Sequence, residues 1–137
     1  MRRIVLDTNC LLQSLPSRSP YHKIWTEMMA GRISLCVNTD ILSEYEEKLA
    51  EKTTPEIARN VLEAITRLHT TVFQQVYFHF GLIEADPDDN KFVDCAFACQ
   101  ADYIVTNDAH FSELKQVKFP IIRLKTMEEF AEEMTDI

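Results

Sequence analysis

The stretch RRIVLDTNCLLQSL, residues 2–15, places a single acid directly after a run of apolar residues. Ile4, Val5 and Leu6 form a pattern that predicts a short strand with two apolar faces, as in a parallel sheet covered by helices. Asp7 stands at the exit of that strand. A carboxylate at such a position is either a turn cap or a residue of a functional site, and the remainder of the chain must distinguish the two.

The composition is that of an ordinary globular domain. The chain has 137 residues, of which 46% are hydrophobic, and we expect one domain over residues 1–137 with a single core. No apolar run approaches the roughly 18 residues of a membrane span, and the N-terminus lacks the pattern of a secretory signal. We therefore expect a cytoplasmic protein with no membrane partner.

Neither the cysteines nor the net charge indicates a particular ligand. The four cysteines lack the two-residue gap of a zinc knuckle, and Cys95 and Cys99 lie four apart in an apolar helix pattern, so we expect reduced core residues. The formal net charge is −8, from 14 basic and 22 acidic residues. If the chain handles RNA or DNA, a local basic rim must hold it and a divalent metal must neutralise the acids.

Predicted strands and helices alternate along the chain. After the first strand we expect a loop that includes residues 16–19, and the further strands are expected at Ile33–Val37, 76–80, 103–106 and 121–124. Helices are expected between them, including a short one at 110–115. Alternation of this kind predicts an α/β fold in which a parallel sheet has helices on both faces.

Several helix ends carry clear signals. Proline at a first helical position and glycine at a stop delimit a helix between Pro20 and Gly31, and Thr54 with Pro55 starts another. The helix after Val37 is expected to begin with Thr39 or Asp40 as its cap. Thr126 and Glu129 form a predicted capping box at the last helix.

The topology brings distant acids together. In a parallel sheet, strand ends and the beginnings of the following helices share one rim. Asp7 and Asp108 end strands, and Glu44 lies one turn into the helix after the second strand. Asp89 and Asp94 lie at the start of another helix and just inside it. Five acids distant in sequence are therefore predicted to converge on the same edge.

Clustered carboxylates need compensation, because they repel and raise one another's pKa. A metal is the usual solution, and hard oxygen ligands suit Mg²⁺ or Mn²⁺. A bound ion can activate a water, orient a phosphate and stabilise a leaving oxygen, which together constitute phosphodiester hydrolysis.

Four motifs, in order, resemble those of a known family. They are DTN at 7–9, SEY at 43–45, DPDDNKF at 86–92 and YIVTND at 103–108. Together they resemble the PIN domain, and more narrowly its branch of toxin components from bacterial and archaeal toxin–antitoxin systems. The resemblance spans most of the chain.

The resemblance implies a fold, an activity and partners. PIN domains are three-layer α/β/α proteins with a five-stranded parallel sheet of order 3-2-1-4-5. They are Mg²⁺- or Mn²⁺-dependent nucleases that act mostly on single-stranded or structured RNA. Toxin members are usually homodimers restrained by an antitoxin. We therefore expect an RNA substrate, an antitoxin partner and a homodimer.

Carried across position by position, the resemblance implies three catalytic metal ligands: Asp7, Glu44 and Asp108. The third of the family's acidic positions falls on Asn90, which is neutral. Asp94 lies one helical turn later on the same face, where its charge has no evident structural use, and we favour it as the remaining catalytic ligand. Asp89 is either a further metal ligand or the N-cap of this helix.

Other residues are candidates for supporting roles. Three are expected to lie behind the acids, where hydrogen bonds orient metal ligands: Asn9, Asn90 and Thr106. Turn roles explain Asn9 and Thr106 equally well. Three cations near the predicted edge are either RNA phosphate contacts or ordinary solvated charges: Arg18, Lys23 and Lys91.

These patterns predict a metal-dependent ribonuclease in which water attacks phosphorus in line, leaving a 5′-phosphate and a 3′-hydroxyl. Two alternatives stay open. One is a catalytically silent binding module on the same fold, weakened by Asn90. The other is a phosphoacceptor receiver module, which also has an acidic Mg²⁺-binding edge but requires paired acids after its first strand.

Overall fold

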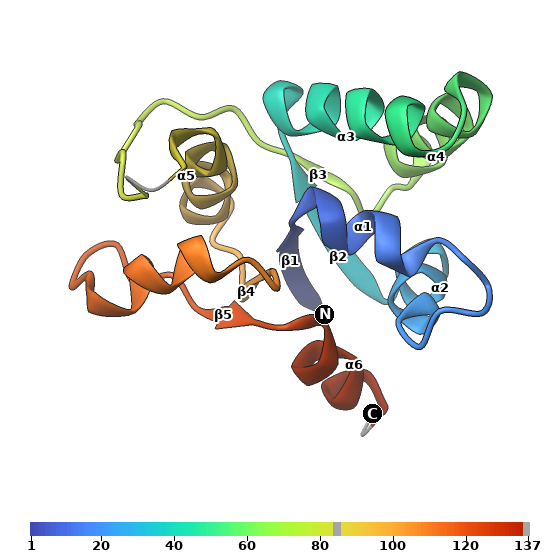
Figure 1. Ribbon diagram of the computed structural model, residues 1–137. Helices are drawn as coiled ribbons and strands as arrows, with labels where there is room; N and C mark the ends of the chain where they lie inside the picture. The colour runs from blue at the N-terminus through green and yellow to red at the C-terminus, as the bar shows by residue number, and fades with distance from the viewer. Residues whose placement is uncertain (84–85, 136–137) are drawn as a thin grey trace.

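A five-stranded parallel sheet runs through the middle of the molecule (Figure 1). The structure is a computed structural model that describes residues 1–83 and 86–135. The strands are β1 (Arg2–Leu6), β2 (Ile33–Val37), β3 (Val72–Phe73), β4 (Tyr103–Val105) and β5 (Leu124–Lys125). Their order is β3-β2-β1-β4-β5, and every neighbouring pair is parallel. The predicted α/β fold with strand order 3-2-1-4-5 is confirmed.

The strand order also removes the receiver-type alternative. Receiver modules are doubly wound in the order 2-1-3-4-5, with the third strand of the chain beside the first. Here β1 lies between β2 and β4. The exits of β1 and β4 are therefore neighbours at the carboxyl edge of the sheet.

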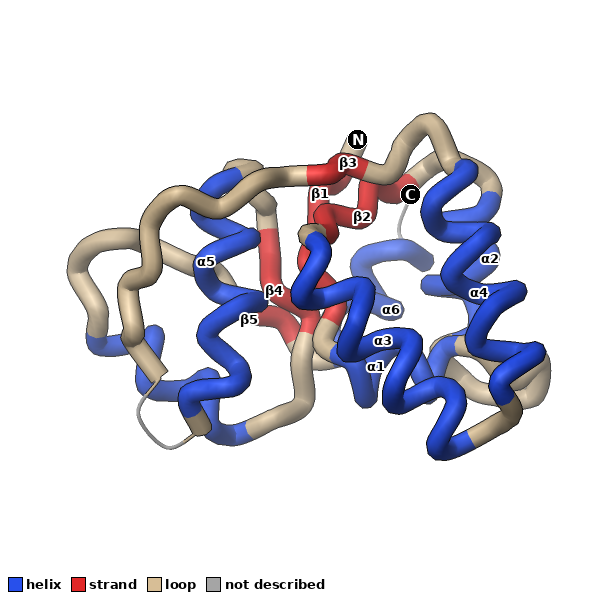
Figure 2. The backbone as a smooth tube through the Cα atoms, turned by 90° about the horizontal axis from the view of Figure 1, so that it is seen from above, coloured by secondary structure: helices blue, strands red, loops and turns tan. Residues whose placement is uncertain are grey.

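Helices cover both faces of this sheet. They are α1 (Thr8–Ser14), α2 (His22–Met29), α3 (Thr39–Lys52), α4 (Pro55–Arg67), α5 (Asn90–Ala98) and α6 (Met127–Thr135), with 3₁₀ helices η1 (Pro87–Asp89) and η2 (Ala109–Gln116). Helix α5 contacts β1, β2 and β4 from one side, and α2 and α6 lie on the other (Figure 2). Within the described residues, no helix is long and apolar enough to cross a membrane.

The core is built on β1, as its two apolar faces predict. Ile4, Val5 and Leu6 are fully buried, which confirms a central strand covered on both sides. The Tyr45 hydroxyl, on α3, donates a hydrogen bond to the Leu6 carbonyl at 2.5 Å. This buried contact ties α3 to the end of β1, the point at which Asp7 emerges.

The structure corrects four of the predicted elements. The loop expected after Asp7 is present at residues 16–19 but starts later than expected, because α1 begins at Thr8 and buries Cys10 and Leu11. Residues 76–80 form no strand, and the third strand lies earlier, at β3. The last strand lies at the C-terminal end of its expected position, and the short helix expected at 110–115 is the longer 3₁₀ helix η2.

Most predicted helix ends are confirmed. The Thr54 hydroxyl accepts a hydrogen bond from the Ile57 N–H at the start of α4. Thr126 and Glu129 exchange two hydrogen bonds, of 2.9 and 3.1 Å, in the expected capping box. The predicted cap of α3 is wrong by one residue, because the side chain of Asn38 accepts from the Ile41 N–H at 2.8 Å.

All four cysteines are free and buried. Three of them, Cys36, Cys95 and Cys99, lie between β2 and α5, and their side chains contact one another. The prediction of reduced core residues is therefore confirmed for this structure. Buried thiols of this kind behave as small apolar groups.

Candidate metal centre

Asp7 lies at the exit of β1, with only 6% of its surface exposed. Its Oδ2 accepts a hydrogen bond from the Thr106 hydroxyl at 2.8 Å. Burial raises the pKa of Asp7, the Thr106 hydrogen bond lowers it, and the charges of Asp108 and Glu44 raise it further. Asp7 makes no capping bond to α1. Its carboxylate is thus a buried charge whose neighbours are other acids.

Thr106 links two of the predicted acids. Besides donating to Asp7, its hydroxyl accepts a hydrogen bond from the Asp108 N–H at 3.0 Å. This is the orienting contact that the sequence predicted for Thr106. Asn9 lines a cavity of about 490 Å³ together with Asp7 and Asp108, but makes no hydrogen bond to either acid among the described residues.

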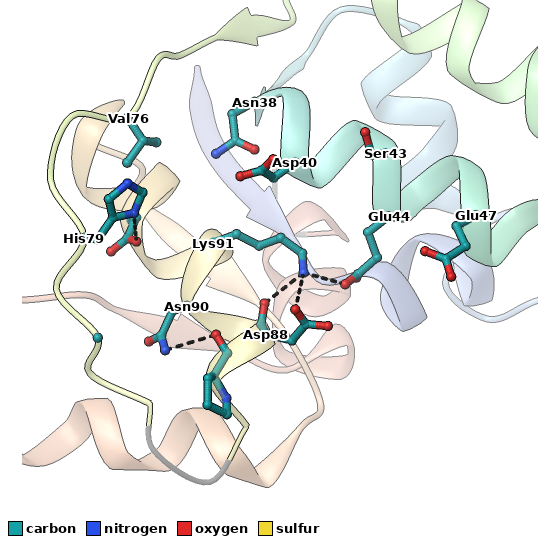
Figure 3. A pocket seen from close by; sticks show the side chains of 13 residues that line it. Asn38, Asp40, Ser43, Glu44, Glu47, Val76, His79, Asp88, Asn90 and Lys91 are labelled. Atoms are coloured by element: carbon teal, nitrogen blue, oxygen red, sulfur yellow. Dashed lines mark hydrogen bonds and ion pairs between the residues drawn. The ribbon is translucent and has the colours of Figure 1, made fainter.

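Glu44 reaches the rim from α3 and is held from two sides. The Thr8 hydroxyl donates a hydrogen bond to it, and the Lys91 ammonium lies 2.7 Å from its Oε1. Figure 3 shows Lys91 reaching from α5 to both Glu44 and Asp88. Lys91, expected as a phosphate contact, is therefore a counterion of the acids in this structure.

Asp89 is at the N-cap position of α5 but does not cap it. Its side chain accepts no capping hydrogen bond, and its Oδ2 is buried with no hydrogen-bond partner among the described residues. Burial raises the pKa of Asp89 to about 7, and the next causes are the charges of Asp86, Asp7, Asp108 and Glu44, in that order. The predicted capping role is wrong, and Asp89 lies within electrostatic reach of the other acids.

Asp94 has a structural partner that the sequence did not reveal. Its Oδ1 accepts a hydrogen bond from the Phe80 N–H at 3.1 Å, and its Oδ2 lies 3.2 Å from Nδ1 of His79. With 4% of its surface exposed, it ties residues 74–82 to α5. The structure therefore contradicts the expectation that its charge has no structural use.

Asp94 also lines a different cavity from Asp7 and Asp108. Its cavity, of about 540 Å³, is bordered by Glu44, Lys91 and His79 (Figure 3). Asp94 thus shares a cavity with Glu44 but not with Asp7 or Asp108, whereas the charges of Asp7, Asp108 and Glu44 all act on Asp89.

Asn90 binds backbone and not the acids. Its Oδ1 accepts from the Ile83 N–H at 2.8 Å, and its Nδ2 donates to the carbonyls of Ile83 and Pro87 at 3.0 and 3.1 Å. The neutral residue at this position thus leaves the acidic cluster intact. Asn90 therefore has a structural use, and the alternative of a silent binding module stays open.

The other two predicted phosphate contacts lie elsewhere. Lys23 contacts the Thr135 hydroxyl at the end of α6. Arg18 is exposed in the loop between α1 and α2. Neither contacts a rim acid among the described residues, so the structure offers no basis for their proposed role.

The sequence analysis missed three residues of the rim. Thr8 holds Glu44, and Asp86 supplies the largest charge effect on Asp89. His110 Nδ1 lies 3.4 Å from Asp108 Oδ1 and 3.9 Å from Asp89 Oδ2. Two of these residues were detectable, because Asp86 opens the acidic motif and His110 follows Asp108 by two positions.

The donor set fits a divalent ion. Four carboxylates from different elements lie within electrostatic reach at one edge of the sheet: Asp7, Glu44, Asp89 and Asp108. Among the described residues, the group whose ligand atoms lie within 4.8 Å of one another is Asp86, Asp89 and His110. The buried Oδ2 of Asp89 has no hydrogen-bond donor among the described residues. Hard oxygen ligands with this excess of negative charge suit Mg²⁺ or Mn²⁺.

Comparison with known proteins agrees with the fold. A family model described as PIN domain matches residues 3–110. No curated protein sequence matches the chain. A structure of VapBC2 from Rickettsia felis bound to a DNA fragment from its promoter is similar with a TM-score of 0.61 and 16% identity, covering 90% of this chain and 98% of that one.

DNA-bound VapBC from Salmonella typhimurium is similar with a TM-score of 0.59 and 19% identity. The likeness covers 93% of this chain and 99% of that one. At these identities, the two structures establish a shared fold and nothing further.

Proposed function

The chain belongs to the PIN domain family, and from this premise we propose that it is a Mg²⁺- or Mn²⁺-dependent ribonuclease. One observation carries the proposal: acids from the ends of two strands and the starts of two helices gather around the buried carboxylate of Asp89. A divalent ion is the natural partner of such a cluster. We propose Asp7, Glu44, Asp89 and Asp108 as its ligands, directly or through water.

When bound, a divalent ion would lower the pKa of a water and stabilise charge on the phosphate. The chain's own residues supply orientation. Thr106 fixes Asp7 relative to Asp108, and Thr8 fixes Glu44. One carboxylate of the cluster would accept the proton of the attacking water. Because that water is external to the RNA, the products would carry a 5′-phosphate and a 3′-hydroxyl.

Lys91 is placed to serve the same chemistry. Its ammonium lies 2.7 Å from Glu44 and 15% of its side chain is exposed. The acids at this position would repel the negatively charged RNA backbone, and a cation beside them reduces that repulsion. In the proposed complex, the Lys91 ammonium contacts a phosphate oxygen beside the scissile bond.

The test is incubation of the purified chain with a mixed RNA pool in Mn²⁺ or in EDTA, followed by sequencing of both new ends. We expect Mn²⁺-dependent cleavage that Asp108→Asn abolishes. Glu128→Gln, at an exposed acid of α6, is the matched control and should cleave normally. Absence of both cleavage and Mn²⁺ binding would instead support a silent binding module.

We also propose that the ribonuclease is a cytoplasmic toxin restrained by a protein antitoxin. The supports are the motifs shared with toxin members and the fold shared with the two VapBC structures. Induced expression should arrest growth, whereas Asp108→Asn should not. The proposed homodimer is measured by light scattering, which should give twice the chain mass of 15.9 kDa.

A further inference from the structure

A histidine and two acids form a compact group at one side of the acidic cluster. Asp86, Asp89 and His110 each offer one ligand atom, and the three atoms lie within 4.8 Å of one another. They come from two segments distant in sequence, since Asp86 caps η1 and Asp89 ends it, whereas His110 belongs to η2. The group is therefore assembled by the fold.

The Asp89 oxygen in this group lacks a hydrogen bond. Asp89 Oδ2 is buried without a partner among the described residues, although His110 Nδ1 lies 3.9 Å away. That distance is too long for a hydrogen bond. It is, however, a separation that two ligands of one ion can have, because each ligand of a first-row metal lies about 2.1 Å from the ion. An ion between the two groups would satisfy both.

Neighbouring contacts leave the required atoms available. Among the described residues, the Asp86 side chain accepts one hydrogen bond, through Oδ1 from the Asp88 N–H at 3.2 Å, and its Oδ2 is not used in that bond. His110 has 48% of its side chain exposed, so its ring can turn toward an ion with little rearrangement. Asp108 Oδ1, 3.4 Å from His110 Nδ1, flanks the same space.

A nitrogen ligand changes which metal the group prefers. Mg²⁺ and Ca²⁺ bind oxygen ligands, whereas imidazole suits the first-row transition metals and zinc. We propose that Asp86, Asp89 and His110 bind a second divalent ion of the transition-metal class. Asp89 would then lie between this ion and the one held by Asp7, Glu44 and Asp108. Only the statement that Asp89 is shared by the two ions rests on the proposed function.

Calorimetric titration of the metal-free full chain tests the proposal, with Co²⁺ and Mg²⁺ as probes. We expect His110→Gln and Asp86→Asn each to weaken one Co²⁺ binding event at least tenfold and to change Mg²⁺ affinity less than threefold. His69→Gln, at an exposed histidine outside the group, should bind both metals as the unchanged chain does. Thermal melting without metal verifies that each variant is folded.

The proposal is overturned if both His110→Gln and Asp86→Asn keep the Co²⁺ affinity of the unchanged chain. The outcome of this titration can be distinguished from the outcome of the RNA cleavage assay. Co²⁺ binding that depends on His110 in a chain that does not cleave RNA supports the site and refutes the ribonuclease. If the chain cleaves RNA but neither substitution changes its Co²⁺ affinity, only the proposed Co²⁺ site is refuted.

Discussion

In the metal-free protein, ionisation of the Asp89 carboxyl lowers the free energy of unfolding. A residue that served only stability would not be expected to have this effect. Its native pKa of about 7 exceeds the value of about 3.9 in an unfolded chain. Between these values the native state binds more protons, so stability falls as the pH rises from about 4 to 7. This sign is the one expected if Asp89 binds a cation, as we propose, because a bound cation would stabilise the ionised carboxylate.

Replacing Asp89 by Asn should therefore stabilise the metal-free protein at pH 8. Because 13% of the side chain is exposed, solvent screening limits the gain, which we expect to be on the order of 1 kcal/mol. The difference should become small at about pH 3, below both pKa values, where the wild-type acid is mostly protonated in both states. Urea unfolding at the two pH values measures it, and a loss of stability at pH 8 would contradict this account.

Asp94 is expected to behave in the opposite way. Asp94→Ala leaves the Phe80 N–H without its acceptor, which should cost about 1–3 kcal/mol of unfolding free energy. Asp94→Asn keeps one side-chain oxygen and should cost less. Urea unfolding provides both values, with His79→Gln as the control, because that partner is 77% exposed and contributes little. A stability gain in Asp94→Ala would show that the contact is not made.

Asp89 and Asp94 show which part of the site could not be predicted from the sequence. Asp7, Glu44 and Asp108 could be placed on the rim because strand ends and helix starts share it. The preference for Asp94 over Asp89 had no such basis, because the answer depends on how α5 is rotated and on what covers it. Asp94 faces residues 74–82, and no pattern in the sequence around it predicts this contact.

The ends of a helix can be predicted from the sequence where interactions between residues close in the chain determine them. The capping box at α6 and the cap of α4 were predictable because both lie within four residues. The strand expected at 76–80 fails for the opposite reason. Phe80 packs against Phe97 with ring centroids 4.9 Å apart, and its N–H bonds to Asp94. Contact with α5 replaces pairing with the sheet.

The cap of α3 offers a test at the scale of one element. Asn38→Ala removes the acceptor of the Ile41 N–H and should destabilise the protein by about 1 kcal/mol, whereas Asn38→Asp should retain most of the stability. Thermal melting compares them with Thr39→Ala, an exposed neighbour whose effect should stay within about 0.5 kcal/mol. An equal loss in Thr39→Ala would return the cap to the position that the sequence suggested.

The whole molecule brings the acids together before any ligand is present. The strand order was predictable from the family resemblance, and the convergence of acids from the general topology of parallel sheets. The rotation of each helix and the placement of long loops were not, because they depend on packing between segments distant in sequence.

Metal binding should therefore appear in global stability. Mn²⁺ binds the native state and should raise the melting temperature by mass action, and Asp7→Asn should reduce that rise. Since a proton competes with the ion at Asp89, whose pKa is about 7, the rise should be smaller at pH 6 than at pH 8. Melting curves at both pH values measure this. A rise that is equal at both pH values would exclude Asp89 from the ligands.

In the proposed mechanism, a cluster completed by Asp89, and not by Asp94, holds the divalent ion needed for RNA cleavage. The measurement that tests it most directly is the single-turnover rate of Mn²⁺-dependent RNA cleavage by Asp89→Asn and by Asp94→Asn, each shown to be folded. We predict a loss of at least about two orders of magnitude for Asp89→Asn and a change of only a few-fold for Asp94→Asn. Full cleavage by Asp89→Asn, with cleavage lost in Asp94→Asn, would contradict the account.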